Sequence, residues 1–326
     1  GGTPLQTQYS TIATGKNLVG KISAASVIGM NATADALIRG WIRTVAANSQ
    51  DVNKLGTAAV LLDDNGLDLG EMINKVMLGS IAYYQATSVY LNSLLDKNNA
   101  VAAVDANGGA LAFTEMEHGW DEAFGYFGAA RDFARYSDAQ LAGTSADYSY
   151  DSNGDGKIDF RSEYNYTFAR YAGRRDRSAG SDLTKEIFDA FLAGRTAIVN
   201  KASVDELIAR RRDVSLAWER IIAATAVHYM NDVERSMRGL DTTSAAATVV
   251  RHQWSEMKGY VIALQFNSLK TISDARLNEL HTLIGSKPVI ADAASAENVD
   301  YRASITSARA IIKSVYGFTD AQMNAW

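Results

Sequence analysis

Cysteine is absent from all 326 residues, and its absence excludes disulfides, thiolate metal sites, iron–sulfur clusters and thiol catalysis. Proline occurs only twice, which is unusually few for a sheet protein of this size and favours helices. No uninterrupted apolar run approaches the roughly 18 to 20 residues that a membrane-spanning helix needs. Any chemistry must therefore use imidazole, carboxylate, hydroxyl or backbone groups.

An excess of basic residues is also missing. The chain carries 32 Lys and Arg against 37 Asp and Glu, which gives a formal net charge of −5. This balance argues against a nucleic-acid partner. Apolar residues make up 47% and charged residues 21%, as in ordinary globular proteins, and the length is sufficient for one or two domains with a large core.

Apolar residues recur at steps of three, four and seven along most of the chain, which predicts long amphipathic helices. The clearest begins at Ser203, with Glu206 placed to complete a capping box; Ser137 with Gln140 repeats that start signal, as does Thr319 with Gln322. Further helices are predicted over residues 19–48, 68–95, 113–136, 182–199, 244–267, 272–285 and 301–315. Strand alternation is hard to find, so we predict an all-α helical bundle.

An internal repeat divides the bundle into two predicted halves. The sequence HGWDEAFGY from His118 is matched by HQWSEMKGY from His252, 134 positions later (252 − 118). We therefore expect an internally duplicated helical unit with two pseudo-symmetric halves. The predicted divisions are an N-terminal extension over 1–16, a first half over 17–170, a connector over 171–182 and a second half over 183–326.

The repeated motif predicts a metal centre. His118 and Glu122 lie one turn apart on one helix face, as do His252 and Glu256. If pseudo-twofold packing brings the two helices together, two imidazoles and two carboxylates converge, a set suited to Zn²⁺ or Fe. Additional candidates on neighbouring predicted helices are Tyr84, His228 and Tyr229.

A structural interpretation of the same residues stays open. Each His/Glu pair can form an intrahelical ion pair, or can bond to Tyr84, Tyr229 or nearby backbone, and so hold the bundle geometry without metal. A buried imidazole or carboxylate must in either case find a partner, because leaving it unsatisfied costs several kcal/mol.

The segment after Tyr150 predicts a calcium site in the connection over 142–162. It reads DSNGDGKID and fits the start of an EF-hand-type loop, in which the glycine at the sixth position permits a sharp turn. The twelfth position is Ser162, and Glu163 follows one place late. The predicted calcium ligands are Asp151, Asn153, Asp155, the Lys157 carbonyl, Asp159 and Glu163. The alternative is a solvated turn without an ion.

A cluster of arginines follows the calcium loop and is interleaved with tyrosines, a pattern that can bind an anion or an acidic sugar. Its members are Arg170, Arg174, Arg175 and Arg177. A solvated hinge paired with nearby acids is the alternative. The remaining histidine, His281, has no ligand spacing around it.

Three stretches resemble the bacterial domain of unknown function 4856. They read GLDLGEMINK from Gly66, MEHGWDEAFGYFG from Met116 and HQWSEMKGY from His252. That family contains envelope lipoproteins and is distantly similar to imelysin-like proteins, which are duplicated helical bundles associated with iron-regulated uptake. The resemblance implies a periplasmic or outer-membrane location, with a leader or lipid anchor outside this sequence as the sole membrane attachment. Imelysins carry a Gly-x-His-x-x-Glu element, which the residues around His118 match only approximately.

These observations predict an envelope protein that binds iron or zinc in support of metal acquisition and carries a structural calcium ion. Standard catalytic motifs are absent, so no enzyme activity is assigned. Two alternatives stay open. One is a non-catalytic surface module that binds an anionic polysaccharide or an envelope protein through the arginine segment. The other is a metallohydrolase, which would need an open coordination position beside a cleft.

Overall fold

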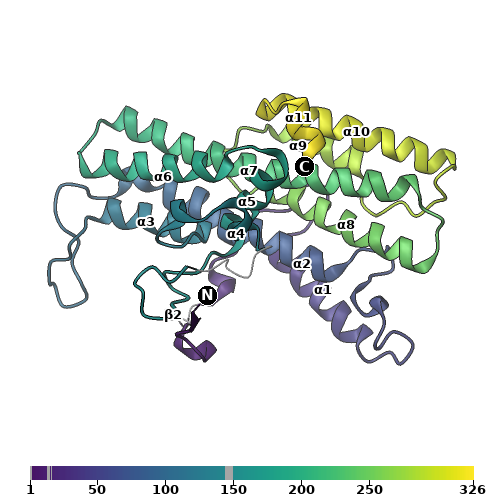
Figure 1. The fold of residues 1–326 in the computed structure, drawn as a ribbon, viewed down its shortest axis with the longest axis horizontal. Helices are drawn as coiled ribbons and strands as arrows, with labels where there is room; N and C mark the ends of the chain where they lie inside the picture. The colour runs from purple at the N-terminus through teal and green to yellow at the C-terminus, as the bar shows by residue number, and fades with distance from the viewer. Residues whose placement is uncertain (1, 13–14, 16, 144–149) are drawn as a thin grey trace. The chain divides into compact units, whose positions relative to one another are not determined.

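The computed structural model describes residues 2–12, 15, 17–143 and 150–326. Helices dominate it (Figure 1). They are α1 (Ala34–Asn48), α2 (Leu69–Met77), α3 (Glu115–Phe127), α4 (Asp138–Ala142), α5 (Thr167–Ala179), α6 (Leu183–Val199), α7 (Val204–Arg238), α8 (Ser244–Ala263), α9 (Asp274–Ile284), α10 (Ala296–Tyr316) and α11 (Asp320–Ala325). Two-residue strands β1 (Thr3–Pro4) and β2 (Lys157–Ile158) pair in parallel. The predicted all-α class is confirmed.

Shorter helical pieces connect these elements. Two π-helical stretches, η4 (Leu78–Tyr83) and η5 (Gln85–Leu91), continue from α2. Single 3₁₀ turns are η1 (Tyr9–Thr11), η2 (Leu18–Gly20), η3 (Ala58–Leu61), η6 (Leu94–Asp96) and η7 (Phe133–Arg135). None of the described helices combines the length and the apolar character that a membrane crossing requires.

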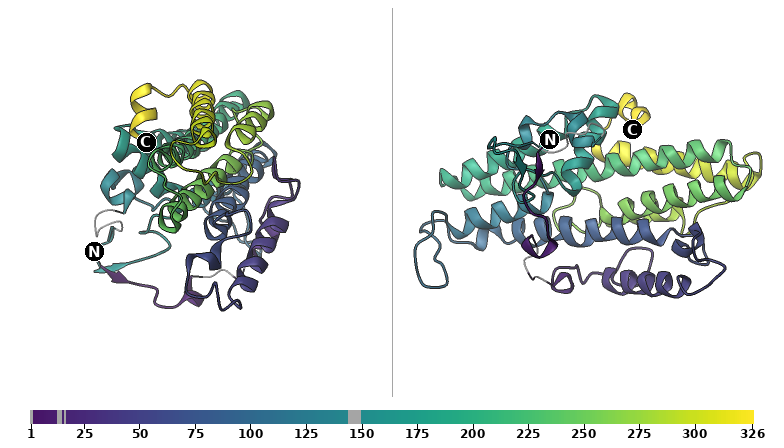
Figure 2. Two further views of the ribbon diagram at one scale, coloured as in Figure 1. Left: turned by 90° about the vertical axis from the view of Figure 1, so that its right-hand side faces the viewer. Right: turned by 60° about the horizontal axis from the view of Figure 1, so that its bottom comes forward.

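Two compact units share the chain. Unit 1 comprises Gly1–Lys21, Ala82–Ile221 and Asn267–Leu269, and unit 2 comprises Ile22–Ile81, Ile222–Phe266 and Lys270–Trp326. The predicted halves 17–170 and 183–326 therefore do not coincide with the units. The physical reason is that α2 packs against α8 and α1 packs against α2, so N-terminal helices complete the C-terminal unit. Figure 2 shows α1 running beside α2.

Unit 1 is built around an aromatic core. Trp218 is fully buried, and its ring lies 5.0 Å from Phe127, 5.3 Å from Phe168 and 5.4 Å from Tyr83, between ring centroids. Gly194 of α6 has no side chain where the Trp120 indole packs, because a Cβ there would overlap the ring. These contacts join α3, α5, α6 and the first part of α7 into one core.

Unit 2 has its own core, centred on α8. The Trp254 indole is fully buried and donates a hydrogen bond to the Tyr301 hydroxyl at 2.5 Å, while that hydroxyl donates to the Ile284 carbonyl at 2.7 Å. These bonds tie α8 to α10 and to the end of α9. The repeated tryptophan of the sequence motif thus serves as a buried anchor, as Trp120 does in unit 1, where its indole donates to the Phe191 carbonyl.

Several predicted boundaries differ from the structure. Beyond the 3₁₀ turn η2, residues 21–33 are not helical, because Gly29 and Asn31 take positive φ angles and the N-cap of α1 is Thr33. Much of the predicted connector 171–182 is the helix α5. The residues 144–149 of the predicted calcium connection, and 1, 13–14 and 16 of the predicted extension, lie outside the described residues.

Candidate metal centre

Two helices of unit 2 bring four acidic and imidazole side chains to one place. Asp68 is the N-cap of α2, where its Oδ1 accepts backbone N–H bonds from Gly70 at 3.0 Å and Glu71 at 3.4 Å. Glu71 follows in the first turn. On α8, His252 and Glu256 lie one turn apart on the same face. The local helix geometry thus aims each pair at the other helix.

The two helices approach closely because of a glycine and a serine. A Cβ on Gly259 of α8 would overlap the Lys75 side chain of α2, so only glycine permits this approach without displacement. At the other end of the contact, the Asp68 backbone N–H donates to the Ser255 hydroxyl at 2.8 Å. Asp68 thus lies beside His252, and Lys75 beside Gly259. The polar face of α2 is held in register with that of α8.

Three donor atoms converge at the centre of this contact. His252 Nε2 lies 3.6 Å from Glu256 Oε2 and 3.9 Å from Glu71 Oε1. Among the described residues, Glu71, His252 and Glu256 form the one group of three that offers ligand atoms within 4.8 Å of one another. Glu256 is buried and the His252 side chain is about half exposed, so a cation has a route in.

Lys75 occupies the buried side of the same cluster. Its Nζ lies 2.8 Å from Glu71 Oε2 and 3.2 Å from Glu256 Oε1. Each glutamate therefore gives one oxygen to the ammonium and turns the other toward the imidazole. Together with Asp68, the cluster has three carboxylates and one ammonium, so it carries a net negative charge that a divalent cation or a proton on His252 can offset.

Asp68 fixes the orientation of His252. Its Oδ2 lies 3.0 Å from His252 Nδ1. This hydrogen bond raises the pKa of His252 against the opposing effect of burial, and the nearby Glu256 and Glu71 charges raise it further. Burial would raise the pKa of Asp68, but the hydrogen bonds from His252 and the backbone of α2 outweigh it and the pKa is lowered. With Nδ1 bonded to Asp68, the neutral imidazole presents the Nε2 lone pair to the glutamates.

Glu256 is the most buried member of the group. Burial raises its pKa, although Lys75 and a hydrogen bond with Tyr229 act in the opposite direction. The Tyr229 ring stacks on Tyr260 with centroids 5.7 Å apart. Tyr229, predicted as an additional site residue, is therefore in contact with the cluster.

The donor set fits a divalent metal ion. Two ligand atoms held about 2.1 Å from one ion lie roughly 3.0 to 3.4 Å apart at octahedral or tetrahedral angles, so the observed separations need only small side-chain adjustments. One imidazole and two carboxylates suit zinc or iron(II). A ligating histidine whose other nitrogen bonds a carboxylate is the usual outer-shell arrangement of such sites.

The other predicted His/Glu pair lies in unit 1. His118 Nε2 is 3.6 Å from Glu122 Oε1 within α3, with both side chains exposed, and the His118 ring stacks on Phe113. Neither residue belongs to the three-membered group. The space beside Gly125 is also open, whereas its counterpart Gly259 touches Lys75.

The remaining candidates near the predicted centre have other positions. His228 Nδ1 lies 3.2 Å from the Trp326 carbonyl oxygen and its Nε2 lies 3.4 Å from Asp232 Oδ2. Tyr84 belongs to unit 1. His228 is not a member of the metal-ligating group found among the described residues.

The predicted calcium loop is ordered by its own side chains. Asp151 accepts backbone N–H bonds from Gly154 and Gly156, both at 2.7 Å, and Asp155 accepts one from the Lys157 N–H at 2.8 Å. Asn153 Oδ1 accepts from the Asp155 N–H at 3.0 Å. Each of these side chains keeps a turn in place, and calcium binding stays a prediction.

Glu163 and Asp159 close this loop. Glu163 is buried, and its carboxylate accepts the Ser152 N–H and the Asp159 N–H, both at 2.9 Å. Asp159 accepts from Gln6 at 2.8 Å, next to the pairing of β1 with β2. Burial opposes the change, but these hydrogen bonds lower the pKa of Glu163. Glu163 is thus committed to the loop backbone.

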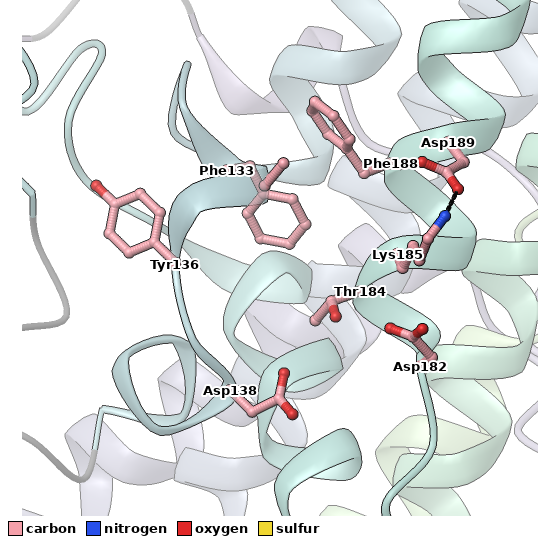
Figure 3. A pocket seen from close by; sticks show the side chains of 9 residues that line it. Phe133, Tyr136, Asp138, Asp182, Thr184, Lys185, Phe188 and Asp189 are labelled. Carbon is pink, nitrogen blue, oxygen red and sulfur yellow. Dashed lines mark hydrogen bonds and ion pairs between the residues drawn. The ribbon is translucent and has the colours of Figure 1, made fainter.

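Unit 1 contains a cavity of about 390 Å³ whose described lining includes three aspartates and no histidine (Figure 3). Asp138 and Asp182 point toward the space between α4 and α6, and burial together with the charges of Asp176 and Asp182 raises the pKa of Asp138. Its lining is Phe133, Ala134, Tyr136, Asp138, Asp182, Thr184, Lys185, Phe188 and Asp189. As described, these carboxylates do not form a metal-ligating group.

Three members of the unit 2 cluster were missed from the sequence. Asp68, Glu71 and Lys75 stand 181 or more positions before the α8 residues that they contact. The only local signal was an N-cap acid followed by polar residues at helical spacing. Nothing in that spacing indicates which other helix will lie against it.

Comparison with known proteins connects the chain to a family model. A family model described as "Domain of unknown function (DUF4856)" matches residues 10–284, a range that contains α2 and α8 and therefore the whole cluster. Comparison with curated proteins and with solved structures gave no significant match.

Proposed function

We propose that the chain, which belongs to the DUF4856 family, binds a divalent transition metal at the α2–α8 cluster, formed by Asp68, Glu71, Lys75, His252 and Glu256. The family description names no activity, so the proposal rests on the geometry of this cluster. The ligands are His252 Nε2 and one oxygen each of Glu71 and Glu256. The observation that carries the proposal is the convergence of these atoms beside an imidazole already oriented by Asp68.

Lys75 supports a binding role in place of a purely structural one. An ammonium alone would satisfy two glutamates, and the helices would need no histidine. With His252 neutral, three carboxylates against one ammonium leave an excess of negative charge next to a solvent-accessible lone pair. A divalent ion restores neutrality at that point, and the chain supplies its ligands without moving either helix.

Zinc titration of the purified protein tests the proposal. Saturating calcium is present, so that the loop over 151–163 does not contribute to the signal. We expect one equivalent to bind, His252→Ala and Glu71→Gln each to weaken binding by at least about tenfold, and His118→Ala to bind within about twofold of wild type. Circular dichroism confirms that each variant is folded. Equal losses in His118→Ala and His252→Ala, or no binding by the wild type, would refute the centre.

We also propose that the bound metal is iron or zinc acquired in the bacterial envelope, as the family resemblance implies. The donor set supports this location because it contains no thiolate, and oxygen and imidazole ligands survive in an oxidising compartment. Cell fractionation and growth of a deletion strain under iron or zinc limitation test it. Recovery in the cytosolic fraction, or unimpaired growth under both limitations, would contradict it.

A structural calcium ion in unit 1 is the second part of the proposal. It is supported by the spacing of Asp151, Asn153 and Asp155, and by the Ile158 backbone, whose carbonyl accepts a bond from Leu5 and so links the loop to the N-terminal segment. Its role is to hold this connection in one conformation.

A further inference from the structure

Helix α5 places a row of cations along an open groove in unit 1. The groove has a volume of about 580 Å³ and runs between the last part of α5 and the end of α4. Arg174, Arg177 and Ser178 share one face of α5, three or four positions apart, and Arg175 follows beside them. The remaining lining residues are Ala142 and Gly143, so the described lining contains no acid.

The shape of the groove depends on two glycines. Gly173 lets α4 approach α5, because a Cβ there would overlap Leu141. Gly143 ends α4 with a φ of +71°, and a Cβ there would overlap the guanidinium of Arg170. Arg174 Nε donates to the Ala142 carbonyl at 3.3 Å, and its guanidinium lies 5.0 Å from the Tyr171 ring centroid. The Arg174 side chain is therefore held between the end of α4 and Tyr171.

The acid within this arginine run faces another way. Asp176 is buried, and its carboxylate accepts the Leu183 N–H and the Thr184 N–H, both at 2.8 Å, at the start of α6. In the described part of the chain, Arg174 and Arg177 have no carboxylate within ion-pair distance, and Arg175 lines the groove with only 5% of its surface exposed. The negative end of the α5 dipole stabilises the charge of Arg177 in the last turn. Arg174 lies one turn earlier, where this effect is weak, so the dipole does not offset its charge.

We propose that this groove binds a small ligand with phosphate or carboxylate oxygens, such as a sugar phosphate or a uronic acid. Guanidinium groups donate paired hydrogen bonds to such oxyanions, and two arginines at helical spacing can hold one between them. The volume lies within the range of small-molecule sites. The Ser178 hydroxyl and the Gly143 backbone add neutral polar groups at the rim.

Calorimetric titration with inorganic phosphate, glucose 6-phosphate and glucuronate tests the proposal. We expect saturable binding of at least one probe, weakened at high ionic strength and by at least about tenfold in Arg174→Gln/Arg177→Gln. The matched control Arg43→Gln/Arg212→Gln removes two exposed charges elsewhere and should change affinity by less than about twofold. Binding of glucuronate alone identifies a carboxylate ligand, and binding of the phosphates alone identifies a phosphate ligand.

Two results would overturn the oxyanion site. No saturable binding of any probe, or an equal loss in the matched control, overturns the groove as an oxyanion site. His252→Ala, which removes the imidazole of the metal centre, should bind these probes as the wild type does. The oxyanion site and the metal centre can therefore fail independently.

Discussion

At the residue scale, the pairing of Asp68 with His252 determines what the centre can do. The carboxylate holds one imidazole nitrogen, so the other is available at the point where Glu71 and Glu256 face it. An unrestrained imidazole would divide its time between two tautomers and several rotamers. Asp68 thus acts as a positioning residue for the proposed metal ligand.

Replacing Asp68 by Asn tests this role. Asp68→Asn keeps the size of the side chain but removes the charge and one of the two acceptor oxygens, so we expect the pKa of His252 to fall toward its ordinary value and zinc affinity to fall roughly 10- to 100-fold. Histidine resonances followed by NMR during a pH titration report the first effect. His118 serves as the control in the same spectra, and a shift of equal size there would contradict the assignment.

The raised pKa of His252 also sets a pH dependence. Protonated His252 stabilises the metal-free fold below its unfolded pKa of about 6.5, and this contribution is lost as the pH rises through the higher folded value. A metal must displace the same proton, so zinc affinity should rise with pH across this window.

Calorimetry in two buffers of different ionisation enthalpy measures the released proton. We expect close to one proton per zinc well below the folded pKa of His252, about half a proton near it and almost none well above it. His252→Ala removes that proton and serves as the comparison. Proton release that does not change across the window would contradict a direct competition at the imidazole.

The sequence predicts residue pairs within one element well. His252 and Glu256 were identifiable because one turn of helix sets their distance. Asp68 and Glu71 were not, because their proximity to His252 depends on which helix α2 packs against, and that is decided by apolar burial spread over α2 and α8. The internal repeat predicts that His252 and Glu256 meet His118 and Glu122 of the other copy. In the structure they meet Asp68 and Glu71 of α2.

At the element scale, Gly125 and Gly259, which occupy the same position in the two repeats, differ in how closely they are packed. Gly259 touches Lys75, whereas the space beside Gly125 is open. We expect Gly125→Ala to stabilise the protein by about 0.5 to 1 kcal/mol, because alanine is the better helix former. Gly259→Ala should destabilise it by about 1 to 3 kcal/mol, because the added methyl forces α2 away from α8.

Chemical denaturation of the two variants measures this difference. Zinc affinity provides a second readout, since the Gly259 substitution moves the helix that carries Glu71 while the Gly125 substitution moves no ligand. Equal changes in stability would show that the packing at Gly259 relaxes without displacement.

The predicted calcium site in the loop over 151–163 is also tested at the element scale. If it holds an ion, Asp151→Ala should abolish the rise in melting temperature that calcium gives the wild type, measured by differential scanning calorimetry. Asp63→Ala, which removes an acid from another turn, should keep that rise. An unchanged calcium response in Asp151→Ala would identify the segment as a turn without an ion.

Helix ends were predictable where capping residues mark them. The capping boxes at Ser137 and Thr319 are both present, and Glu206 donates its N–H to the Ser203 hydroxyl at the start of α7. Helix α5 was missed because its arginines and glycines resemble a polar loop. Its buried face has one large apolar residue, Phe168, and otherwise small residues such as Ala169 and Ala172 together with charged ones, so its overall hydrophobicity is low.

At the scale of the whole molecule, the two proposed cation sites belong to different units. The loop over 151–163 is part of unit 1, and the α2–α8 cluster is part of unit 2. If each ion binds the folded form of its own region, as proposed, it should stabilise that region by mass action. The boundary between the units lies within α7, so one continuous helix serves both.

Hydrogen exchange followed by mass spectrometry tests this division. We expect zinc to slow exchange in α2 and α8, and calcium to slow it around β1 and β2, with little effect of either ion on the other region. The metal-free and calcium-free proteins are the references. Protection of both regions by zinc alone would show that the sites are coupled.

If the centre binds a metal as proposed, Lys75 also affects how the ion is taken up. Because its ammonium already balances part of the charge between the glutamates, the two carboxylates are held close together before an ion arrives. Under the proposed function, loading and release would then require proton exchange at the half-exposed ring of His252 and no rearrangement of α2 against α8.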